Sequence, residues 1–186
     1  YQSIDDLIAE WKRDPRAFPF TGGSIGSIDH LIMAQLAMEA GIDASLTTYI
    51  PTTSGGEALQ SVFSDTSKAA ISGYNEFADQ IEAGRVRALA ISAPERLDGV
   101  DIPTLLEQGY DVQMTNWRGI LAAPGTSDED FDELLAIVTE MAATEEWADS
   151  LSRNKWDDTF MTGREFEDFI VSEEAAVIEI LRGLNL

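Results

Sequence analysis

The first half of the chain alternates short apolar segments, glycine-rich turns and amphipathic segments. Each turn leads directly into residues whose apolar positions recur with helical spacing. Strands that alternate with helices in this way predict an α/β fold with a parallel sheet and right-handed crossovers. The predicted strands are residues 18–21, 46–50, 68–72 and 86–91, and the first three are followed by the turns GGSIGSIDH (22–30), SGGE (54–57) and SGY (72–74).

After Pro94 this alternation stops. Residues 102–109 predict a short helix, and residues 112–122 predict one long strand. Capping boxes at Ser127 and Thr162 predict two further helices with apolar residues on their inner faces. Few strands remain for these helices to cover, so the C-terminal part has the pattern of a domain whose sheet is incomplete within this chain.

The charge balance excludes several classes of protein. The 186 residues include 34 acidic and 12 basic side chains, for a formal net charge of −22. Nucleic-acid binding is excluded because it needs a basic surface, and attraction to an anionic membrane surface is disfavoured. The acidic residues are spread along the chain, which indicates a strongly solvated surface and is also typical of adaptation to high salt. The chain has no cysteine, hence no disulfide or thiolate metal site.

The apolar content gives no indication of membrane insertion. It amounts to 44% of the residues, which is typical of a globular protein, and no apolar run approaches the length of a membrane span. The first residues, YQSIDDLIAEW, are amphipathic and acidic, unlike a signal peptide.

The first two glycine-rich turns predict a site for a small anion. A helix N-terminus presents unpaired N–H groups and a partial positive charge, and the hydroxyls of Ser24, Ser27 and Ser54 add donors. Consecutive β-α units open at the same edge of a parallel sheet. Neither turn matches a dinucleotide or P-loop motif, and no Lys or Arg lies between Arg16 and Lys68. A carboxylate therefore fits better than a triphosphate.

Plainer interpretations remain open at this point. The turns could be ordinary βα connections, with glycine for backbone geometry and serine for capping. His30, the single histidine, could be a packing residue, and Ser27, Asp29 and His30 lie too close along one helical turn to form a relay. Glu57 and Glu76 could form a carboxylate pair, although nothing in their spacing brings them together. We expect no metal site and no cofactor.

Four segments in fixed order resemble the substrate-binding proteins of the tripartite tricarboxylate transporters, the TctC or Bug family. The resemblance extends from Tyr1 to about Leu186. The segments are GGSIGSIDHLIMAQLAMEAGID (22–43), YIPTTSGGEAL (49–59), ISGYNEFADQIEAGRVRALAISAPERL (71–97) and DIPTLLEQGYDVQMTNWRGILAAPGT (101–126).

This resemblance implies a fold like that of the type 2 periplasmic binding proteins. It would comprise one β-α-β domain and the C-terminal part of a second α/β domain. Residues 1–92 and about 100–112 would form the second, ligand-binding domain of the family. Residues from about 113 to 186 would supply the crossover strand and the C-terminal helices of an incomplete first domain.

The resemblance also implies a function without catalysis: periplasmic capture of a small carboxylate and its delivery to membrane permease subunits. In the family, β-α loops hold the carboxylate through amides, hydroxyls and waters. Transferred to this sequence, the ligand-binding positions are Gly23, Ser24, Gly26, Ser27, His30, Tyr49, Ser54, Gly55, Gly56, Ser72, Gly73 and Tyr74.

The sequence departs from the family pattern in two respects. Family members have a signal peptide and roughly a hundred further residues before this region, so we expect a fragment that lacks half of the ligand clamp. In addition, Ser64-Asp65-Thr66-Ser67-Lys68 replaces the usual glycines, and an inward-pointing Lys68 would change the floor of the cleft.

Two other functions remain open. One is a small α/β hydrolase- or transferase-like enzyme that uses Ser27 or Ser72 with His30 as base. The other is a receptor whose liganded form docks on a membrane sensor instead of a permease.

Overall fold

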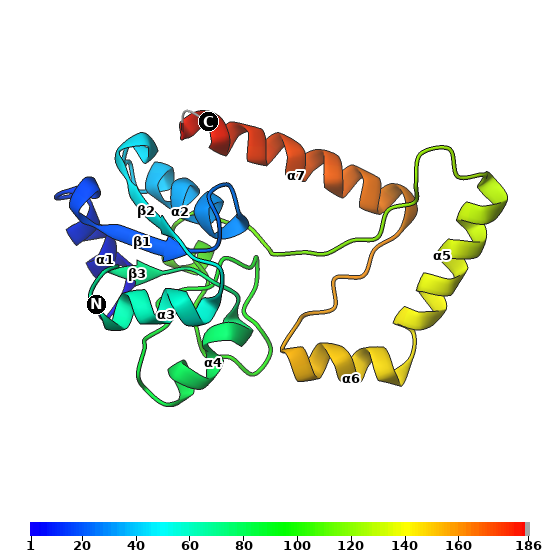
Figure 1. The fold of residues 1–186 in the computed structure, drawn as a ribbon, viewed down its shortest axis with the longest axis horizontal. Coiled ribbons are helices and arrows are strands. Elements are labelled where there is room, and N and C mark those ends of the chain that lie inside the picture. Colours follow the sequence, from blue (N-terminus) through cyan, green and yellow to red (C-terminus); the bar gives the residue numbers. More distant parts are fainter. Residues whose placement is uncertain (185–186) are drawn as a thin grey trace. The chain divides into compact units, whose positions relative to one another are not determined.

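The structure, a computed structural model, describes residues 1–184 and contains two compact units. The first unit consists of residues 1–116 together with the C-terminal residues from Glu174 on, and the second consists of Trp117–Glu173. The elements of the first unit are α1 (Ile4–Trp11), η1 (Pro15–Ala17), β1 (Pro19–Gly22), α2 (Ile28–Glu39), η2 (Ala44–Leu46), β2 (Thr48–Pro51), α3 (Gly55–Phe63), β3 (Ala69–Ala70), α4 (Tyr74–Glu82) and η3 (Leu106–Gln108) (Figure 1).

A three-stranded parallel sheet forms the centre of the first unit, in the order β2-β1-β3 (Figure 1). Phe20 of β1 is paired with Tyr49 on one side and with Ala69 on the other. The predicted α/β fold with a parallel sheet is therefore confirmed. Because β1 is the central strand, the turn that follows it lies between the turns that follow β2 and β3.

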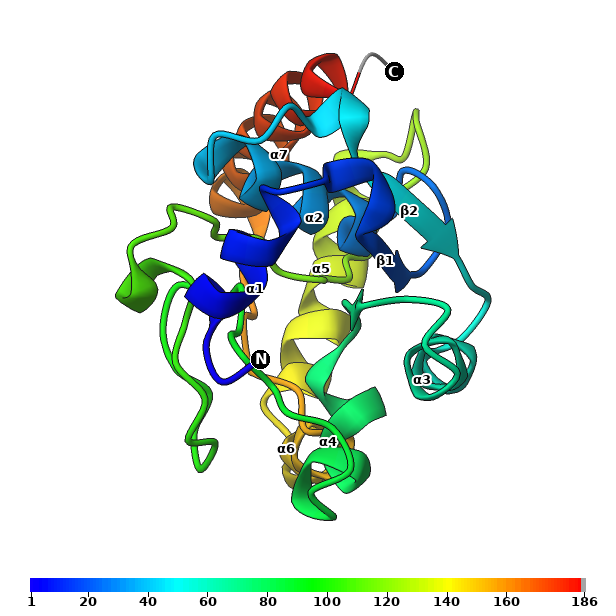
Figure 2. The ribbon, with the colours of Figure 1, turned by 90° about the vertical axis from the view of Figure 1, so that its left-hand side faces the viewer.

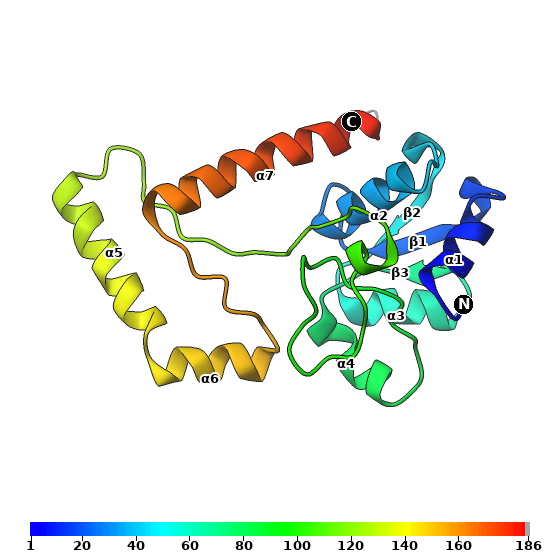
Figure 3. The same ribbon diagram turned by 180° about the vertical axis from the view of Figure 1, so that it is seen from behind.

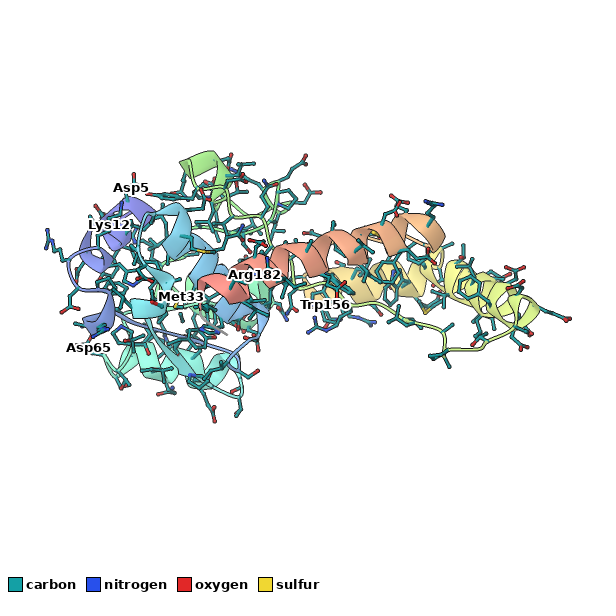
Figure 4. The ribbon with its side chains drawn as sticks, turned by 90° about the horizontal axis from the view of Figure 1, so that it is seen from above. Asp5, Lys12, Met33, Asp65, Trp156 and Arg182 are labelled. Carbon is teal, nitrogen blue, oxygen red and sulfur yellow. The ribbon has the colours of Figure 1, made fainter. Side chains whose placement is uncertain are left out.

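The main core lies on one face of this sheet, against α1 and α2 (Figure 2). Ser3 caps α1 through a capping box, and Trp11 at the other end of that helix is fully buried. The Trp11 ring packs 4.5 Å from the ring of Phe20, measured between centroids. Met33 of α2, labelled in Figure 4, is also fully buried. These contacts fix α2, and with it the turn from β1, against the sheet.

Helix α3 contacts β1 and β3 from the other side of the sheet (Figure 2). Its buried residues, Ala58 and Leu59, do not belong to the main core cluster. The sheet therefore lies between two helical layers, and α2 and α3 both begin at its carboxyl edge.

Two predicted strands did not form. Residues 86–91 contribute only an isolated bridge between Ile91 and Thr104, and residues 112–122 run as coil (Figure 3). A strand is completed by hydrogen bonds to a neighbour, and no described strand pairs with either segment. The predicted helix at 102–109 is only the short η3.

The second unit contains the helices α5 (Asp128–Ala142), α6 (Glu145–Asn154) and the first part of α7 (Gly163–Gly183). Ser127 caps α5 as predicted, by accepting a hydrogen bond from the Asp130 amide. The Trp117 ring packs edge-on against Phe166 and Phe169 and donates to Glu173 at 3.1 Å.

The predicted burial of the inner face of α5 is wrong within this unit. No residue of α5 is buried, and Phe131 and Leu134, which were expected to face inward, are 40% and 50% exposed. An amphipathic pattern determines which face of a helix is apolar, but another element has to cover that face, and no described element of this unit does.

The assignment of the chain to two domains of a receptor stays a prediction. The units divide at Asn116, and residues from Glu174 return to the first unit, with Ile180 in its core. Residues 185 and 186, the end of the predicted first-domain segment, lie outside the described residues. Across residues 1–184, the helices are too short or too polar to cross a bilayer.

Candidate functional site

The turn between β1 and α2 carries the first group of predicted site residues. Helix α2 begins after Ser27, which has the extended backbone of an N-cap residue but makes no capping hydrogen bond. No described residue accepts a hydrogen bond from the amides of Ile28, Asp29 or His30. This helix N-terminus therefore keeps its donors and the partial positive charge that accompanies them.

The side chain of Asp29 occupies one of the backbone amides of this turn. Asp29 Oδ2 accepts a 2.7 Å hydrogen bond from the Gly23 amide. A Cβ atom on Gly22 would lie 2.5 Å from Tyr49 Oη and 2.8 Å from Asp29 Cβ. Glycine is required here because these side chains lie directly on the backbone. The described contacts thus assign Gly22 to the protein's own packing.

His30 stabilises the turn from inside. Its Nδ1 accepts a 3.1 Å hydrogen bond from the Gly26 amide, and its ring lies 4.5 Å from the Tyr49 ring. The side chain is only 7% exposed, and this burial lowers the pKa of His30, which keeps the imidazole neutral and able to accept. His30 is therefore a hydrogen-bonded packing residue.

Tyr49 connects β2 to the same turn. Its hydroxyl donates a 2.9 Å hydrogen bond to the Gly23 carbonyl, and burial raises the pKa of Tyr49 to about 12. The Ser27 hydroxyl lies close enough to the phenol to oppose that rise in pKa. The contact does not have the geometry of a hydrogen bond, and the Ser27 oxygen is buried without a hydrogen-bond partner among the described residues.

The turn between β2 and α3 joins the first turn at the sheet edge. Thr52 donates to the Gly22 carbonyl through its amide at 2.8 Å and through its hydroxyl at 2.7 Å. Ser54 caps α3 by accepting from the Glu57 amide. Glu57 in turn accepts from the amide and hydroxyl of Thr53, and the Thr53 amide bond holds the pKa of Glu57 below its usual value.

A second internal carboxylate lies where α3 and α4 begin. Glu76 Oε1 accepts a 3.3 Å hydrogen bond from the Gly55 amide, and Glu76 Oε2 accepts a short hydrogen bond from the Ser72 hydroxyl. A Cβ atom on Gly55 would lie 2.8 Å from Glu76 Cβ. The α3 N-terminus is therefore partly neutralised by Glu76.

These turns surround one open cavity of about 130 Å³ within the first unit. Of the predicted site residues, Gly23, Ser54, Gly55 and Ser72 line it. Ser24, Gly26, Ser27, His30 and Tyr49 belong to the adjoining turn or its support, while Gly56, Gly73 and Tyr74 do not line the cavity. The remaining lining residues, which sequence reasoning did not include, are Gly22, Asp29, Thr53, Ala58 and Glu76.

Asp29 and Glu76 give this cavity a negative lining. Burial raises the pKa of Asp29, the bond from the Gly23 amide opposes that rise, and the charge of Glu76 adds to it. Glu57 and Glu76, for which the sequence left a carboxylate pair open, do not line the cavity together: Glu76 lines it, whereas Glu57 bonds to Thr53 and does not. The sequence feature that could have identified these two lining residues is an acidic residue in the first turn of a helix, Asp29 in α2 and Glu76 in α4.

The donors expected at the glycine-rich turns are free only in part. The amides of Gly23, Gly26 and Gly55 are occupied by Asp29, His30 and Glu76. An unpaired buried amide is costly, and side chains in the first helical turn are close enough to satisfy it. Among the described residues, the amides of the α2 N-terminus and the Ser27 hydroxyl keep donors without an acceptor.

Three other candidate features do not contribute to this cavity. Lys68 Nζ forms a 2.7 Å ion pair with Asp65 and does not line the cavity floor. No hydrogen bond joins Ser27 to His30 among the described residues. Within residues 1–184 no group of three or more His, Asp or Glu side chains has the arrangement of a metal site.

Comparison with known proteins identifies the family of this chain. The family model for the tripartite tricarboxylate transporter family receptor, TctC, matches residues 1–186. The UPF0065 protein of the gbd 5′ region of Cupriavidus necator is 25% identical over 186 residues, which is 97% of this chain and 55% of that protein. Protein BugT of Bordetella pertussis is 29% identical over 126 residues, or 67% of this chain and 38% of BugT.

Solved structures share the fold. A TctC solute-binding protein from Polaromonas superposes with a TM-score of 0.80 at 22% identity, over 98% of this chain and 62% of that one. An R. palustris protein solved with adipate gives 0.80 at 19% identity, over 100% and 62%. MatC from Rhodopseudomonas palustris, solved with bound malate, gives 0.68 at 20% identity, over 99% and 61%.

The chain thus spans about half the length, or less, of the curated relatives it matches. With the family model matched from end to end, the chain belongs to the tripartite tricarboxylate transporter receptor family, TctC.

Proposed function

We propose that this protein is a periplasmic solute-binding receptor that captures a small organic carboxylate and delivers it to the permease subunits of a tripartite tricarboxylate transporter. Membership of the receptor family supports this proposal. Two proteins of the same fold were solved with carboxylates, adipate in one and malate in the other.

The observation that carries the proposal is the uncapped N-terminus of α2. The Ser27 hydroxyl oxygen is buried without a partner, and the amides of Ile28, Asp29 and His30 have no acceptor among the described residues. Such a set of donors stabilises an anion without a cationic side chain. The set adjoins the cavity at Gly23, since a Cβ atom there would lie 3.0 Å from Ser27 Oγ.

The contacts do not favour the enzymatic alternative. His30 Nδ1 already accepts from Gly26, and Ser27 has no hydrogen bond to it. The Ser72 hydroxyl donates to Glu76, but a carboxylate is a much weaker base than an imidazole for activating serine at neutral pH.

Ligand binding by the full-length receptor, freed of co-purified ligand, tests the proposal. A panel of mono-, di- and tricarboxylates, with and without amino or hydroxyl substituents, should raise the melting temperature for at least one acid. Ser27→Ala should weaken binding of that acid about tenfold or more, because a hydrogen bond to a charged group is lost. Ser64→Ala, at the other end of α3, is the matched control.

A panel without any stabilising acid would contradict the proposal, as would turnover of any of the acids. The transporter role has its own measurement, the uptake of the labelled acid by cells with and without the receptor gene. Uptake that does not depend on the receptor would favour the sensor role instead.

A further inference from the structure

We infer that ionic strength regulates ligand capture by this receptor. At low salt the acidic elements around the cavity repel an approaching carboxylate, and at high salt their charge is screened and the carboxylate binds more tightly. This inference rests on the proposed function and concerns the regulation of the same cavity.

The elements that build the cavity are rich in acidic residues and poor in basic ones. Helices α2, α3 and α4 and all three strands contain no Lys or Arg. Residues 17–80 include one basic side chain against seven acidic ones, a formal net charge of −6 within a chain of net charge −22. The basic residue is Lys68, and the acidic residues are Asp29, Glu39, Asp43, Glu57, Asp65, Glu76 and Asp79.

The cation on these elements does not offset the charge at the cavity. Lys68 Nζ forms a 2.7 Å ion pair with Asp65, and neither residue lines the cavity. No Lys or Arg is among the described residues that line it. An anion that approaches the cavity therefore meets a surface of its own sign.

The hydrogen bonds of the lining carboxylates leave their charge in place. Asp29 accepts from the Gly23 amide, and Glu76 accepts from the Gly55 amide and the Ser72 hydroxyl. All three donors are neutral, so they orient the carboxylates without cancelling the charge.

The repulsion that a ligand would meet already acts between the two lining residues. The pKa of Asp29 is raised first by burial and also by the negative charge of Glu76, which lies on a different helix. The field of Glu76 thus reaches across the cavity to the turn between β1 and α2. A carboxylate that enters the cavity experiences the same field.

Salt acts differently on this repulsion and on the contacts that hold a ligand. The Debye length is about 30 Å at 0.01 M salt, about 8 Å at 0.15 M and about 3 Å at 1 M, so repulsion at a distance weakens steeply. Hydrogen bonds from backbone amides act at contact distance and are screened far less. Affinity should therefore rise with salt, whereas a cavity lined by Lys or Arg would attract the same acid and lose affinity as salt is added.

Calorimetry on the full-length receptor at neutral pH tests this sign with succinate, malate, glutarate, adipate and citrate. For the acid that binds most tightly, we expect affinity to increase about threefold or more between about 0.02 M and 0.5 M ionic strength. Sodium chloride and sodium sulfate should give the same increase at matched ionic strength, because screening depends on ionic strength. Competition by the salt anion would instead weaken binding.

Glu76→Gln removes one lining charge but keeps an oxygen for the Gly55 amide. It should bind the acid more tightly than the natural protein at low salt and about equally at high salt, which reduces the salt dependence to about half. Asp98→Asn removes an exposed charge outside these elements and should leave the salt dependence nearly unchanged.

A second variant keeps the test decisive if Glu76→Gln is misfolded, which its melting temperature without ligand would reveal. Glu57 begins α3 without lining the cavity and accepts from Thr53. Glu57→Gln keeps an oxygen for Thr53 and should reduce the salt dependence in the same direction, by a smaller amount.

Three results overturn the inference and leave the proposed function intact. They are an affinity that is constant or falls as salt is added, an increase confined to one of the two salts, and a salt dependence that Glu76→Gln and Glu57→Gln leave unchanged. Absence of binding for every acid at both ionic strengths overturns the proposed function itself.

Discussion

Asp29 Oδ2 lies 2.7 Å from the Gly23 amide nitrogen, so that a side chain from the first turn of α2 occupies a donor of the turn before it. Glu76, in the first turn of α4, accepts in turn from the Gly55 amide at the start of a different helix, α3. The candidate site is thus built from internal carboxylates as well as backbone donors, which restricts the ligands that it can accept.

Removal of the Asp29 side chain should destabilise the protein. Asp29→Ala leaves the part-buried Gly23 amide without an acceptor, and we expect the free energy of unfolding to fall by about 1–3 kcal/mol. Asp29→Asn keeps an oxygen and should lose less. Urea denaturation of the full-length protein measures both, with Asp79→Ala as the exposed control. Equal losses for Asp29→Ala and Asp79→Ala would show that the Gly23 contact contributes no stability.

The stability conferred by Asp29 should depend on pH in a particular direction. Its pKa is raised above the usual 3.8, first by burial, so the folded protein binds this proton more tightly than the unfolded chain does. The corresponding stability is fully present below pH 3.8 and is lost as pH rises through the raised pKa. Relative to Asp29→Asn, the natural protein should therefore lose unfolding free energy across that window. A difference of opposite sign would show that the Gly23 hydrogen bond outweighs burial.

Neighbouring glycines at the start of α3 should respond differently to a methyl group. Gly55→Ala places Cβ 2.8 Å from Glu76 Cβ, and overpacking of this kind costs about 1–3 kcal/mol. Gly56→Ala meets only Ser54 Oγ at 3.8 Å, and within a helix it should stabilise by about 0.5–1 kcal/mol. Melting temperatures of the two variants should therefore move in opposite directions, and a shared direction would be inconsistent with the described packing.

His30 should titrate below its ordinary pKa of 6.5, because burial disfavours the charged imidazole. The proton NMR signal of this ring, assigned by its loss in His30→Gln, gives the value directly. Protonation of Nδ1 also removes the acceptor of the Gly26 amide, so the Gly26 resonance should shift in the same pH range. A pKa at or above 6.5 would contradict the buried, neutral role of His30.

The local sequence was sufficient for most elements of the first unit. The glycine turns located the beginnings of α2, α3 and α4. These signals depend on neighbouring residues, which is why they can be read from one chain. The strand predicted at 112–122 lacked such support, since a strand depends on a partner elsewhere.

The sequence alone determined the α/β class, the parallel sheet, the family and the presence of donors at consecutive helix N-termini, because each follows from residue type and spacing. Tertiary structure decided which donors remain free. It brought Asp29 and Glu76 to the same cavity. Asp29 and Glu76 are 47 residues apart in the sequence, and only the pairing of β1 with β3 places the turns that carry them side by side.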